Sequence, residues 1–247
     1  MTLSEFFAAS PRAALGLSGG VDSAYLLYAA RACGADVRPY FIRTPFQPAF
    51  ELADARALAA QLDVPLTVLD LDVLADPAVA ANPPDRCYHC KAALFGALAA
   101  RARADGYPVL LDGTNASDDA DDRPGMRALR ELGVRSPLRA CGLTKEEIRR
   151  LAREAGLAVW DKPAYACLAT RVPTGRTITA ADLARVERAE AALHGLGFAD
   201  FRVRLYGDGA RIQLKEKQLA AALTRRGDIL DALRPDFTAV LLDLETR

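Results

Sequence analysis

The sequence predicts an α/β fold with a doubly wound, mainly parallel sheet, followed by a small α+β domain. Over the first two-thirds of the chain, short apolar runs alternate with segments of helical spacing, which is typical of βαβ units. A loop rich in proline and small residues at 160–175 ends this alternation. A helix, a hairpin, a second helix and a strand then follow. We therefore place a first domain at residues 1–175 and a second at 176–247.

Apolar spacing and helix-end signals define the individual elements. The predicted strands of the first domain are 13–17, 37–42, 66–71 and 109–111, and its helices are 21–33, 49–62, 88–103, 125–132 and 144–155. Gly34 ends the first helix, and Thr144 with Glu147 forms a capping box at the start of the last. The second domain is predicted to contain helices 180–193 and 218–233, a hairpin of 201–205 and 210–214, and a strand at 237–242.

Composition excludes several classes of protein. Lysine plus arginine and aspartate plus glutamate both number 32, so the chain has no excess of positive charge for nucleic acid, and we expect no nucleic-acid partner. Residues 1–10 do not form a signal peptide, and no apolar run is long enough to span a bilayer. We therefore expect a cytoplasmic protein without a membrane partner. Its five cysteines are then more plausible as metal ligands or catalytic groups than as disulfides.

The first predicted strand is joined to the first helix by the loop Ser18-Gly19-Gly20-Val21-Asp22-Ser23. Glycines let the backbone approach a phosphate closely, the helix start offers free N–H groups, and both serines add hydroxyl donors. Asp22 would repel phosphate unless it helps to hold Mg²⁺. The loop lacks the Lys-Ser/Thr pair of a Walker A motif, which argues against transfer of a γ-phosphate. The plainer interpretation is a strand-turn-helix with a capping serine.

Other polar residues also follow predicted strands. Arg43 comes after the second strand, and Gly113 and Thr114 come after the fourth. Ligands of parallel sheets bind beyond the carboxyl ends of the strands, so we expect these residues to join the loop in binding ATP. The loop resembles the PP-loop of ATP pyrophosphatases, which are adenine nucleotide alpha hydrolase-like proteins. This resemblance implies cleavage of ATP between the α and β phosphates and transfer of AMP to a substrate oxygen.

Three of the cysteines lie near this predicted site. Cys87 and Cys90 form a Cys-x-x-Cys pair at a helix start, and Cys167 lies in the proline-rich loop. A helix start lowers a thiol pKa, which suits a redox pair. Zinc would need a fourth ligand, such as His89 or Cys141. Three thiolates could instead hold a [4Fe–4S] cluster with one open iron. Burial as small apolar residues is the remaining alternative.

Several motifs, taken together and in order, are similar to the LarE family. They are Arg86-Cys87-Tyr88-x-Cys90-Lys91 and the segments 112–115, 122–125, 136–138, 142–145, 160–164, 166–168 and 201–204. They cover nearly the whole chain and are more specific than the loop alone. The resemblance implies an ATP-dependent, AMP- and pyrophosphate-forming sulfur transferase that makes the nickel-pincer nucleotide cofactor of lactate racemase. Its substrate would be pyridinium-3,5-biscarboxylic acid mononucleotide, which is adenylated on a carboxylate and converted to a thiocarboxylate.

The resemblance also implies roles for individual residues. Asp22 and Cys167 would be catalytic, because Cys167 matches the family's sulfur-carrying cysteine. Some members sacrifice this cysteine. Others are thought to hold a [4Fe–4S] cluster through three cysteines, and then need sulfide or another sulfur donor. This chain matches the second type through Cys87, Cys90 and Cys167. The family further implies a homo-oligomer, a trimer or a hexamer, with the second domain as a contact.

The anionic substrate suggests further candidates. Arg202 and Arg204 alternate along a predicted strand and so share one face, and guanidinium groups suit phosphate and carboxylate. Arg171 and Glu190 are weaker candidates for binding substrate. One of the aspartates in 118–122 could help to hold Mg²⁺. Three rival functions remain: a tRNA-thiolating enzyme, an amide-forming enzyme such as an NAD synthetase, and a redox-sensing nucleotide-binding regulator.

Overall fold

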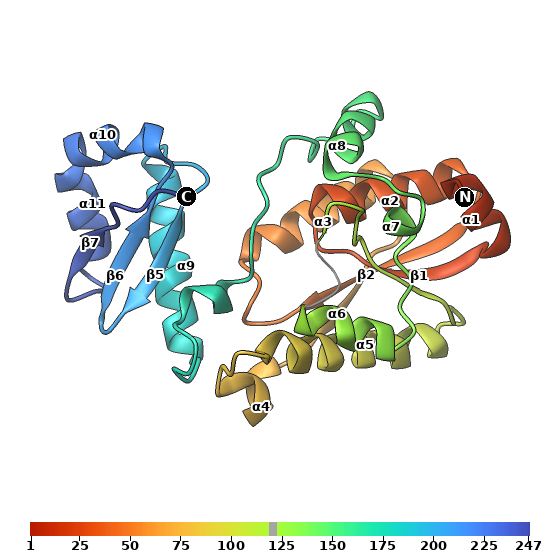
Figure 1. Cartoon of the computed structure of the whole chain (residues 1–247), viewed down its shortest axis with the longest axis horizontal. Coiled ribbons are helices and arrows are strands. Elements are labelled where there is room, and N and C mark those ends of the chain that lie inside the picture. The colour runs from red at the N-terminus through yellow and green to blue at the C-terminus, as the bar shows by residue number, and fades with distance from the viewer. Residues whose placement is uncertain (119–122) are drawn as a thin grey trace. The chain divides into compact units, whose positions relative to one another are not determined.

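The computed structural model describes residues 1–118 and 123–247, which form two compact units. The first unit contains Met1–Val73 and Asp85–Tyr165, and the second contains Leu74–Pro84 and Ala166–Arg247 (Figure 1). The chain thus visits the second unit at 74–84 and returns to it at Ala166, earlier than the predicted boundary at 175. It does so because the 3₁₀ helix η2 (Leu168–Arg171) packs against α9 (Ala180–Gly195) and β5 (Arg202–Tyr206).

A four-stranded parallel sheet forms the centre of the first unit. Its order is β3-β2-β1-β4, from β1 (Arg12–Gly16), β2 (Asp36–Arg43), β3 (Thr67–Asp70) and β4 (Leu110–Leu111). A parallel bridge between Leu111 and Arg135 continues the pairing beyond β4. β1, β2 and β4 are mostly buried, as expected for a parallel sheet covered on both faces, whereas β3 at the edge of the order is only half-buried. The predicted α/β class is therefore confirmed.

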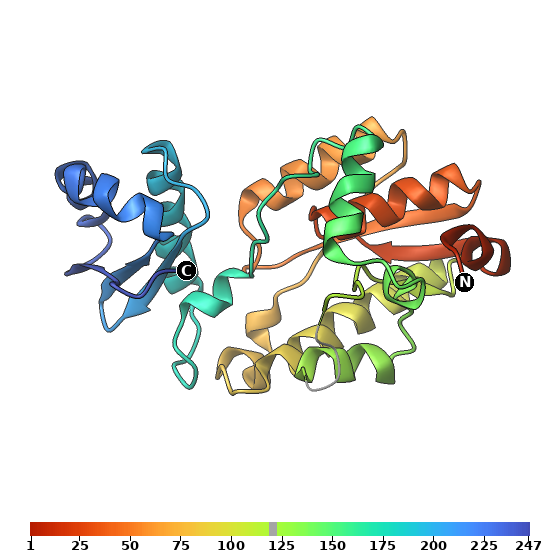
Figure 2. The ribbon, with the colours of Figure 1, turned by 45° about the horizontal axis from the view of Figure 1, so that its top comes forward.

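Helices cover both faces of this sheet (Figures 1 and 2). The face with α2 (Val21–Ala32), α3 (Ala49–Gln61) and α8 (Lys145–Glu154) receives Ala13 and Leu15 of β1. The opposite face receives Ala14, which packs with Leu98 of α5 (Arg86–Ala104). The helix α6 (Pro124–Glu131) packs against α5. The alternation of side chains along a strand therefore supplies one apolar cluster to each face.

Several short helices were not predicted. Besides η2, they are α1 (Leu3–Ala9), η1 (Val73–Ala75), α4 (Pro77–Ala80) and α7 (Pro137–Ala140). Of these, α1 begins with a capping box between Thr2 and Glu5 and buries Phe6 and Phe7 in the core. The predicted capping box of Thr144 with Glu147 and the left-handed Gly34 (φ 72°) at the end of α2 are both present.

The second unit is built on the sheet β5-β6-β7, with β6 at Gly209–Gln213 and β7 at Val240–Leu242. The hairpin β5–β6 is antiparallel, as predicted, whereas β7 is parallel to β6 and shorter than the predicted 237–242. The predicted helix 218–233 is divided into α10 (Glu216–Thr224) and α11 (Arg226–Leu233). Thr224 and Gly227 favour a break there because both have low helix propensity.

Within residues 1–118 and 123–247, no helix is both long enough and apolar enough to cross a membrane.

Candidate functional site

The loop between β1 and α2 has the backbone of an anion-binding turn. Gly20 is the N-cap of α2 in an extended conformation, so the first N–H groups of the helix follow it directly. Gly19 is left-handed at φ 73°, and a Cβ there would lie 3.0 Å from the carbonyl oxygen of Glu51. Position 19 therefore requires glycine for both conformation and space. The predicted loop joins a strand to a helix, as its motif requires.

Serine hydroxyls brace the loop from inside. The backbone N–H of Ser18 donates to Oγ of Ser23 at 3.2 Å, and that hydroxyl donates to the carbonyl oxygen of Gly20 at 3.2 Å. The N–H of Gly20 donates to Oγ of Ser18 at 3.4 Å. These bonds close the loop into a compact ring, so its free N–H groups are held ready for an anion.

Asp22 lies in the first turn of α2 and is held from two sides. Nζ of Lys145 is 2.5 Å from its Oδ2, and Nδ2 of Asn115 donates to its Oδ1 at 3.3 Å. Its side chain keeps 21% of its accessible surface. Carboxylate oxygens are preferred ligands of Mg²⁺, which usually keeps several waters and binds one or two carboxylates. Asp22 therefore fits a magnesium ion bound beside the phosphate loop.

Two cavities adjoin the loop within the first unit. One, of about 160 Å³, is lined by Ser18, Gly20, Val21 and Asp22 and by the segment 162–165. The other, of about 130 Å³, lies at the carboxyl ends of β1 and β2 and has a mostly apolar lining that includes Tyr40 and Phe95. Ser18 and Glu51 line both. A polar cavity next to an apolar one matches a phosphate chain joined to a flat, apolar base.

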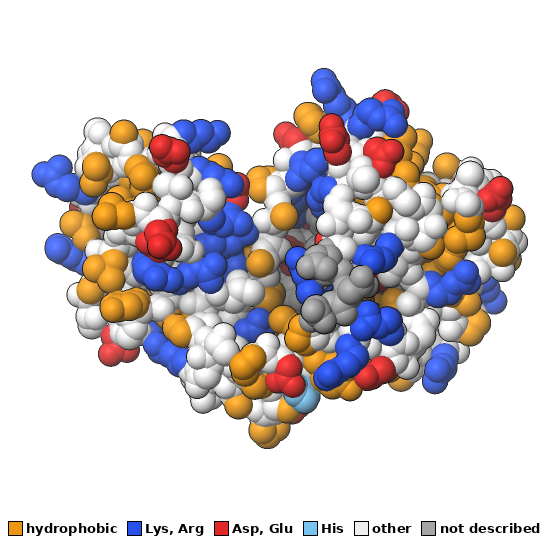
Figure 3. Space-filling view, in the orientation of Figure 1, with side chains coloured by type: hydrophobic (Ala, Val, Ile, Leu, Met, Phe, Trp, Pro, Cys, Tyr) orange, Lys and Arg blue, Asp and Glu red, His pale blue; other side chains and the backbone are white. Residues whose placement is uncertain are grey.

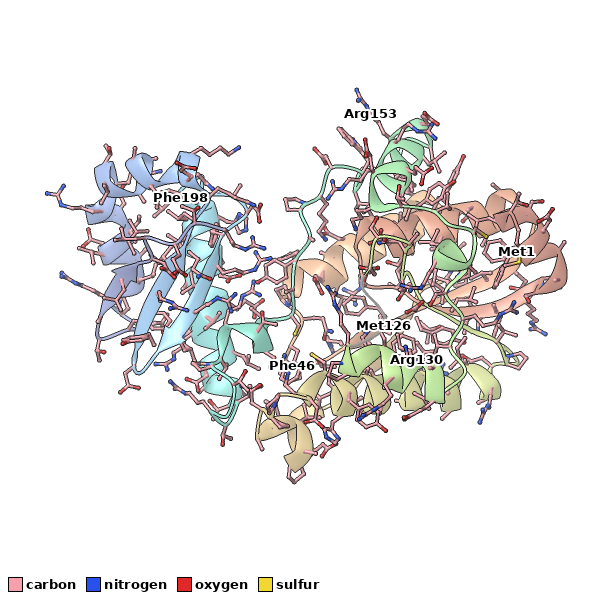
Figure 4. The ribbon with its side chains drawn as sticks, viewed as in Figure 1. Met1, Phe46, Met126, Arg130, Arg153 and Phe198 are labelled. Carbon is pink, nitrogen blue, oxygen red and sulfur yellow. The ribbon has the colours of Figure 1, made fainter. Side chains whose placement is uncertain are left out.

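The residues after β4 support the loop from the side. A Cβ on Gly113 would lie 2.9 Å from the backbone nitrogen of Ser23, so the two segments are in direct backbone contact. The Thr114 hydroxyl donates to Oδ2 of the buried Asp112 at 2.5 Å, and Asp112 also accepts from Oγ of Ser136 at 2.6 Å. Met126 of α6, labelled in Figure 4, places its sulfur 3.9 Å from the same hydroxyl.

Arg43 and the acidic run at 118–122 were also expected near the loop. Arg43 ends β2 and pairs with Asp70 at the end of β3, and it is not among the described residues that line either cavity. Asp118 accepts from the N–H of Asn115 at 2.9 Å and so closes a local turn. The other members of the predicted run, Asp119, Asp121 and Asp122, lie outside the described residues. Binding of ATP by Arg43, Gly113 and Thr114 stays a prediction.

Two lysines, Lys145 and Lys162, line the cavity of about 160 Å³ beside the phosphate loop, and they were not predicted from the sequence. Lys162 donates from Nζ to the carbonyl oxygen of Gly19 at 3.0 Å and lies 2.5 Å from Oδ2 of Asp54. Its ammonium group also lies 5.2 Å from the centre of the Phe50 ring. Both lysines belong to the motifs that suggested the family, but their sequence positions alone do not place them at residues 18–23.

The Cys-x-x-Cys pair occupies the first turn of α5. Cys87 is exposed and Cys90 is half-buried, and none of the five cysteines, all within the described residues, forms a disulfide. Tyr88 fixes this turn to α6, because its hydroxyl donates to Oε2 of Glu131 at 2.7 Å and its ring stacks under Arg127 at 4.1 Å. The bond to Glu131 raises the pKa of Tyr88.

The environment of the pair bears on the metal alternatives. His89 faces Asp85 at 3.4 Å, and burial raises the pKa of the Cys141 thiol. Phe46, labelled in Figure 4, lies under the guanidinium of Arg86 at the start of α5. Across the part of the chain that the structure describes, no three Cys, His, Asp or Glu side chains form a metal-binding group. Zinc binding with His89 or Cys141 and cluster binding by Cys87, Cys90 and Cys167 both stay predictions.

Cys167 belongs to the second unit, where a buried ion pair holds its backbone. Arg171 and Glu190 form two hydrogen bonds of 2.8 and 3.0 Å, and their side chains are 0% and 5% exposed. Arg171 also donates to the carbonyl oxygens of Ala166 and Cys167, at 2.7 and 3.3 Å. Glu190 accepts from the N–H of Val203 at 2.9 Å. Arg171 therefore holds the backbone at Cys167, and contact of Arg171 or Glu190 with substrate stays a prediction.

Arg202 and Arg204 lie on one face of the second sheet, opposite Gln213 and Arg211 of β6. Lys and Arg side chains gather over β5 and β6 in Figure 3. Arg204 donates to Oε1 of Gln213 at 2.6 Å and to the carbonyl oxygen of Thr170 at 2.5 Å. Burial and the nearby charges of Arg171, Arg211 and Arg247 lower the pKa of Arg204. An anion at this face would relieve that repulsion.

The phosphate loop, its carboxylate and the parallel sheet define an α/β enzyme of the PP-loop class. No family model matches the chain. A pyridinium-3,5-bisthiocarboxylic acid mononucleotide synthase of Lactiplantibacillus plantarum is 34% identical over 94% of this chain and 86% of its own length. An uncharacterised protein of Synechocystis is 37% identical over 98% and 92%. The chain belongs to the LarE family of PP-loop sulfur transferases, as the motifs predicted.

A more distant similarity joins this family to tRNA-modifying enzymes. A tRNA-specific 2-thiouridylase of Acidithiobacillus ferrooxidans is 29% identical over 62% of this chain and 52% of its own length. This similarity covers only part of each chain, and it supports the PP-loop fold.

Proposed function

We propose that this protein is an ATP-dependent sulfur transferase that converts a carboxylate of pyridinium-3,5-biscarboxylic acid mononucleotide into a thiocarboxylate. The product would contribute to the nickel-pincer cofactor of lactate racemase. The observation that carries the proposal is the phosphate loop, whose cavity brings Asp22 together with Ser18 and Gly20. The similarity to the L. plantarum synthase over nearly the whole chain supports the choice of substrate.

The phosphate loop accounts for activation of the substrate. A carboxylate is a poor electrophile, so a leaving group must first be attached to it. An oxygen of the substrate carboxylate attacks the α-phosphorus of ATP, the bond from that phosphorus to the bridging oxygen breaks, and pyrophosphate leaves. Ser18, Gly20 and the start of α2 hold the phosphates during this step. Asp22 would hold Mg²⁺, which supplies positive charge to the phosphate chain.

Sulfur then replaces AMP on the activated carbon. We place Cys167 at this step, where Arg171, itself paired with Glu190, donates to the carbonyl oxygens of Ala166 and Cys167. Thiolates are the usual ligands of iron–sulfur clusters, and the accessible Cys87 and half-buried Cys90 are a suitable pair on one helical turn. With Cys167 they would hold a [4Fe–4S] cluster, whose fourth iron supplies a site for sulfide. The three cysteines are divided between the two units.

The arginines of the second sheet would bind the anionic substrate. Arg202 and Arg204 lie on one face of β5, although Arg202 is buried and donates to the carbonyl oxygen of Phe201 at 2.6 Å, and planar guanidinium groups pair well with phosphate and carboxylate. This assignment places the substrate phosphate at the second unit and the ATP phosphates at the first.

We also propose a homo-oligomer, a trimer or hexamer, which light scattering coupled to gel filtration would test.

The proposal is tested with protein purified without oxygen and supplied with ATP, Mg²⁺, substrate and sulfide. We expect substrate-dependent release of pyrophosphate, a thiocarboxylate product by mass spectrometry, several turnovers, and bound iron. Cys167→Ala should abolish the thiocarboxylate but keep the release of pyrophosphate, because activation precedes sulfur attack. The exposed Cys33 gives the control variant Cys33→Ala.

Two results would change these assignments. Failure of the substrate to stimulate pyrophosphate release would sink the proposed function. A single turnover that removes the mass of H₂S from Cys167 would keep the reaction but replace the cluster by sacrifice of the cysteine. In that case the Cys167 thiolate attacks the acyl carbon and AMP leaves. Loss of the Cα proton then breaks the Cβ–S bond, so that sulfur stays on the product and dehydroalanine stays in the chain.

A further inference from the structure

Two lysines share the cavity beside the phosphate loop. We infer that Lys145 and Lys162 bind the terminal phosphates of ATP, which leave as pyrophosphate, and this inference rests on the proposed function. Both side chains line the cavity with Ser18, Gly20 and Asp22, and they reach it from different parts of the chain. Their side chains are 33% and 20% exposed, so a ligand can reach both ammonium groups.

Lys145 is fixed at its backbone. It is the first residue of α8, directly after Thr144, whose capping box with Glu147 sets the start of that helix. The backbone N–H of Lys145 also donates to Oγ of Ser117 at 3.0 Å, in the segment that follows β4. Bonds from Thr144 lower the pKa of Glu147, so the capping carboxylate is ionised at neutral pH. The side chain of Lys145 therefore starts from a rigid point and reaches Asp22.

Lys162 is fixed in a different way. Arg149 donates to the carbonyl oxygens of Trp160 and Lys162 at 3.1 and 2.8 Å, which holds this segment against α8. A few residues further on, the ring of Tyr165 packs against Phe50 of α3 at 5.1 Å. Between these two anchors, Nζ of Lys162 contacts the loop backbone itself, at the carbonyl oxygen of Gly19. A phosphate held by the loop would lie next to this ammonium group.

The chemistry of the loop calls for such cations. A helix start contributes only about half a unit of positive charge, far less than the charge of a triphosphate. The loop has no lysine of its own, whereas phosphate loops of the Walker type carry one. Lysine binds phosphate as a point charge, with three donors that can turn toward several oxygens. The two lysines therefore supply the charge that residues 18–23 lack.

The partners of the lysines explain how the contact is made. Each ammonium group is paired with a carboxylate, Lys145 with Asp22 and Lys162 with Asp54. The two ammonium groups and the two carboxylates therefore have no net charge together. An anion is bound only weakly there unless a divalent cation binds with it. When Asp22 turns to Mg²⁺, Lys145 exchanges its carboxylate partner for a phosphate oxygen. The lysines then contact phosphates that AMP does not have.

This difference between ligands gives the test. Calorimetry on the full chain should show that Lys145→Met and Lys162→Met each weaken the binding of ATP with Mg²⁺ by about 10- to 100-fold, the range of one charge-assisted hydrogen bond. Binding of AMP should change by less than about 3-fold, a shift too small for a lost contact. The control is Arg150→Met on the same helix, because Arg150 pairs with Glu154 at the exposed surface. Equal losses for ATP and AMP, or no loss, would overturn the inference.

A second measurement needs no variant. Acetylation of lysines in the wild-type protein, followed by peptide mass spectrometry, should slow at Lys145 and Lys162 when ATP or pyrophosphate is added with Mg²⁺. AMP should not slow it, and Lys215 in the second unit should react equally in all samples. If ATP binds but both lysines stay fully reactive, the inference about the lysines is wrong and the proposed function still stands. If the wild type does not bind ATP with Mg²⁺, both the inference and the proposed function are wrong.

Discussion

A methyl group at position 113 would collide with the backbone of the phosphate loop. The Cβ of alanine there would lie 2.9 Å from the nitrogen and 3.2 Å from the Cα of Ser23, and backbone atoms cannot turn aside as a flexible side chain can. We expect Gly113→Ala to push the start of α2 away from β4 and to weaken binding of ATP at least 10-fold, a cost of about 1.4 kcal/mol.

Gly96 provides the matched control for this glycine. It lies within α5, and a Cβ there would meet no atom within 4 Å. Gly96→Ala should leave ATP binding unchanged and stabilise the protein by about 1 kcal/mol, because alanine has the higher helix propensity. Calorimetry and urea unfolding of both variants separate the two effects. If Gly113→Ala binds ATP as well as the wild type, the loop tolerates the collision.

Residues near the loop differ in how well the sequence predicted them. Residues 18–23 were predictable because their function is encoded within one turn, where glycine conformation and helix start are local properties. Lys145 and Lys162 were not, because their ammonium groups reach the loop through tertiary packing of α8 and of the segment after it. In the second unit, Arg171 and Glu190 are buried against each other, and their contact with substrate stays a prediction. Their charge was visible in the sequence, and their partner was not.

At the scale of elements, a hydrogen bond fastens β2 to the end of α5. The Tyr40 hydroxyl donates to Oδ2 of Asp105 at 2.9 Å, and Tyr40 is fully buried. Burial and this carboxylate raise the pKa of Tyr40 to about 12. An unfolded tyrosine loses its proton near pH 10. Between these values the folded state holds a proton that the unfolded state has lost, so stability falls as pH rises.

This linkage predicts a pH-dependent effect of Tyr40→Phe. The variant should be destabilised most below pH 10, and its deficit should shrink above that pH by about 1.4 kcal/mol for each pH unit. Urea unfolding at intervals from pH 8 to 11 measures the deficit. Tyr206→Phe is the control, because Tyr206 is 63% exposed. A deficit that stays constant across this range would mean that Tyr40 does not carry the linkage.

Strands and helices with strong apolar periodicity were predictable. The short helix α1 and the division between α10 and α11 were not. The four parallel strands and the helices between them agree with their predicted spans to within a few residues, because apolar spacing determines burial. The helix α1 was missed although its capping box, Thr2 with Glu5, is present in the sequence. The break at Arg225 arises partly from tertiary contact, since the Arg225 guanidinium bonds to the carbonyl oxygen of Leu196.

At the scale of the molecule, Asn82 ties the segment 74–84 to the rest of the second unit. Its Nδ2 donates to the carbonyl oxygens of Val172 and Pro173 at 3.3 and 2.8 Å, and its own carbonyl oxygen accepts from the N–H of Gly175 at 2.8 Å. Asn82 is also left-handed at φ 56°, a conformation that asparagine tolerates better than alanine.

Asn82→Ala should therefore destabilise the second unit by about 2 to 3 kcal/mol, from lost hydrogen bonds and backbone strain. Asn82→Gly removes the same bonds without the strain and should recover about 1 kcal/mol. Hydrogen exchange would show faster exchange in β5 and β6 and unchanged exchange in β1 and β2. Equal acceleration in both units would show that Asn82 stabilises the whole chain and not the second unit alone.

The route of the chain also bears on how such a protein can evolve. The second unit is made of two separate stretches, Leu74–Pro84 and Ala166–Arg247, and the first unit is interrupted by the shorter one. A single recombination event between genes could not exchange either unit intact, because it would leave the residues around Asn82 without the carbonyl groups they bind. The two units are therefore expected to be inherited together, and a gene that loses the second must also lose or rebuild a loop in the middle of the first.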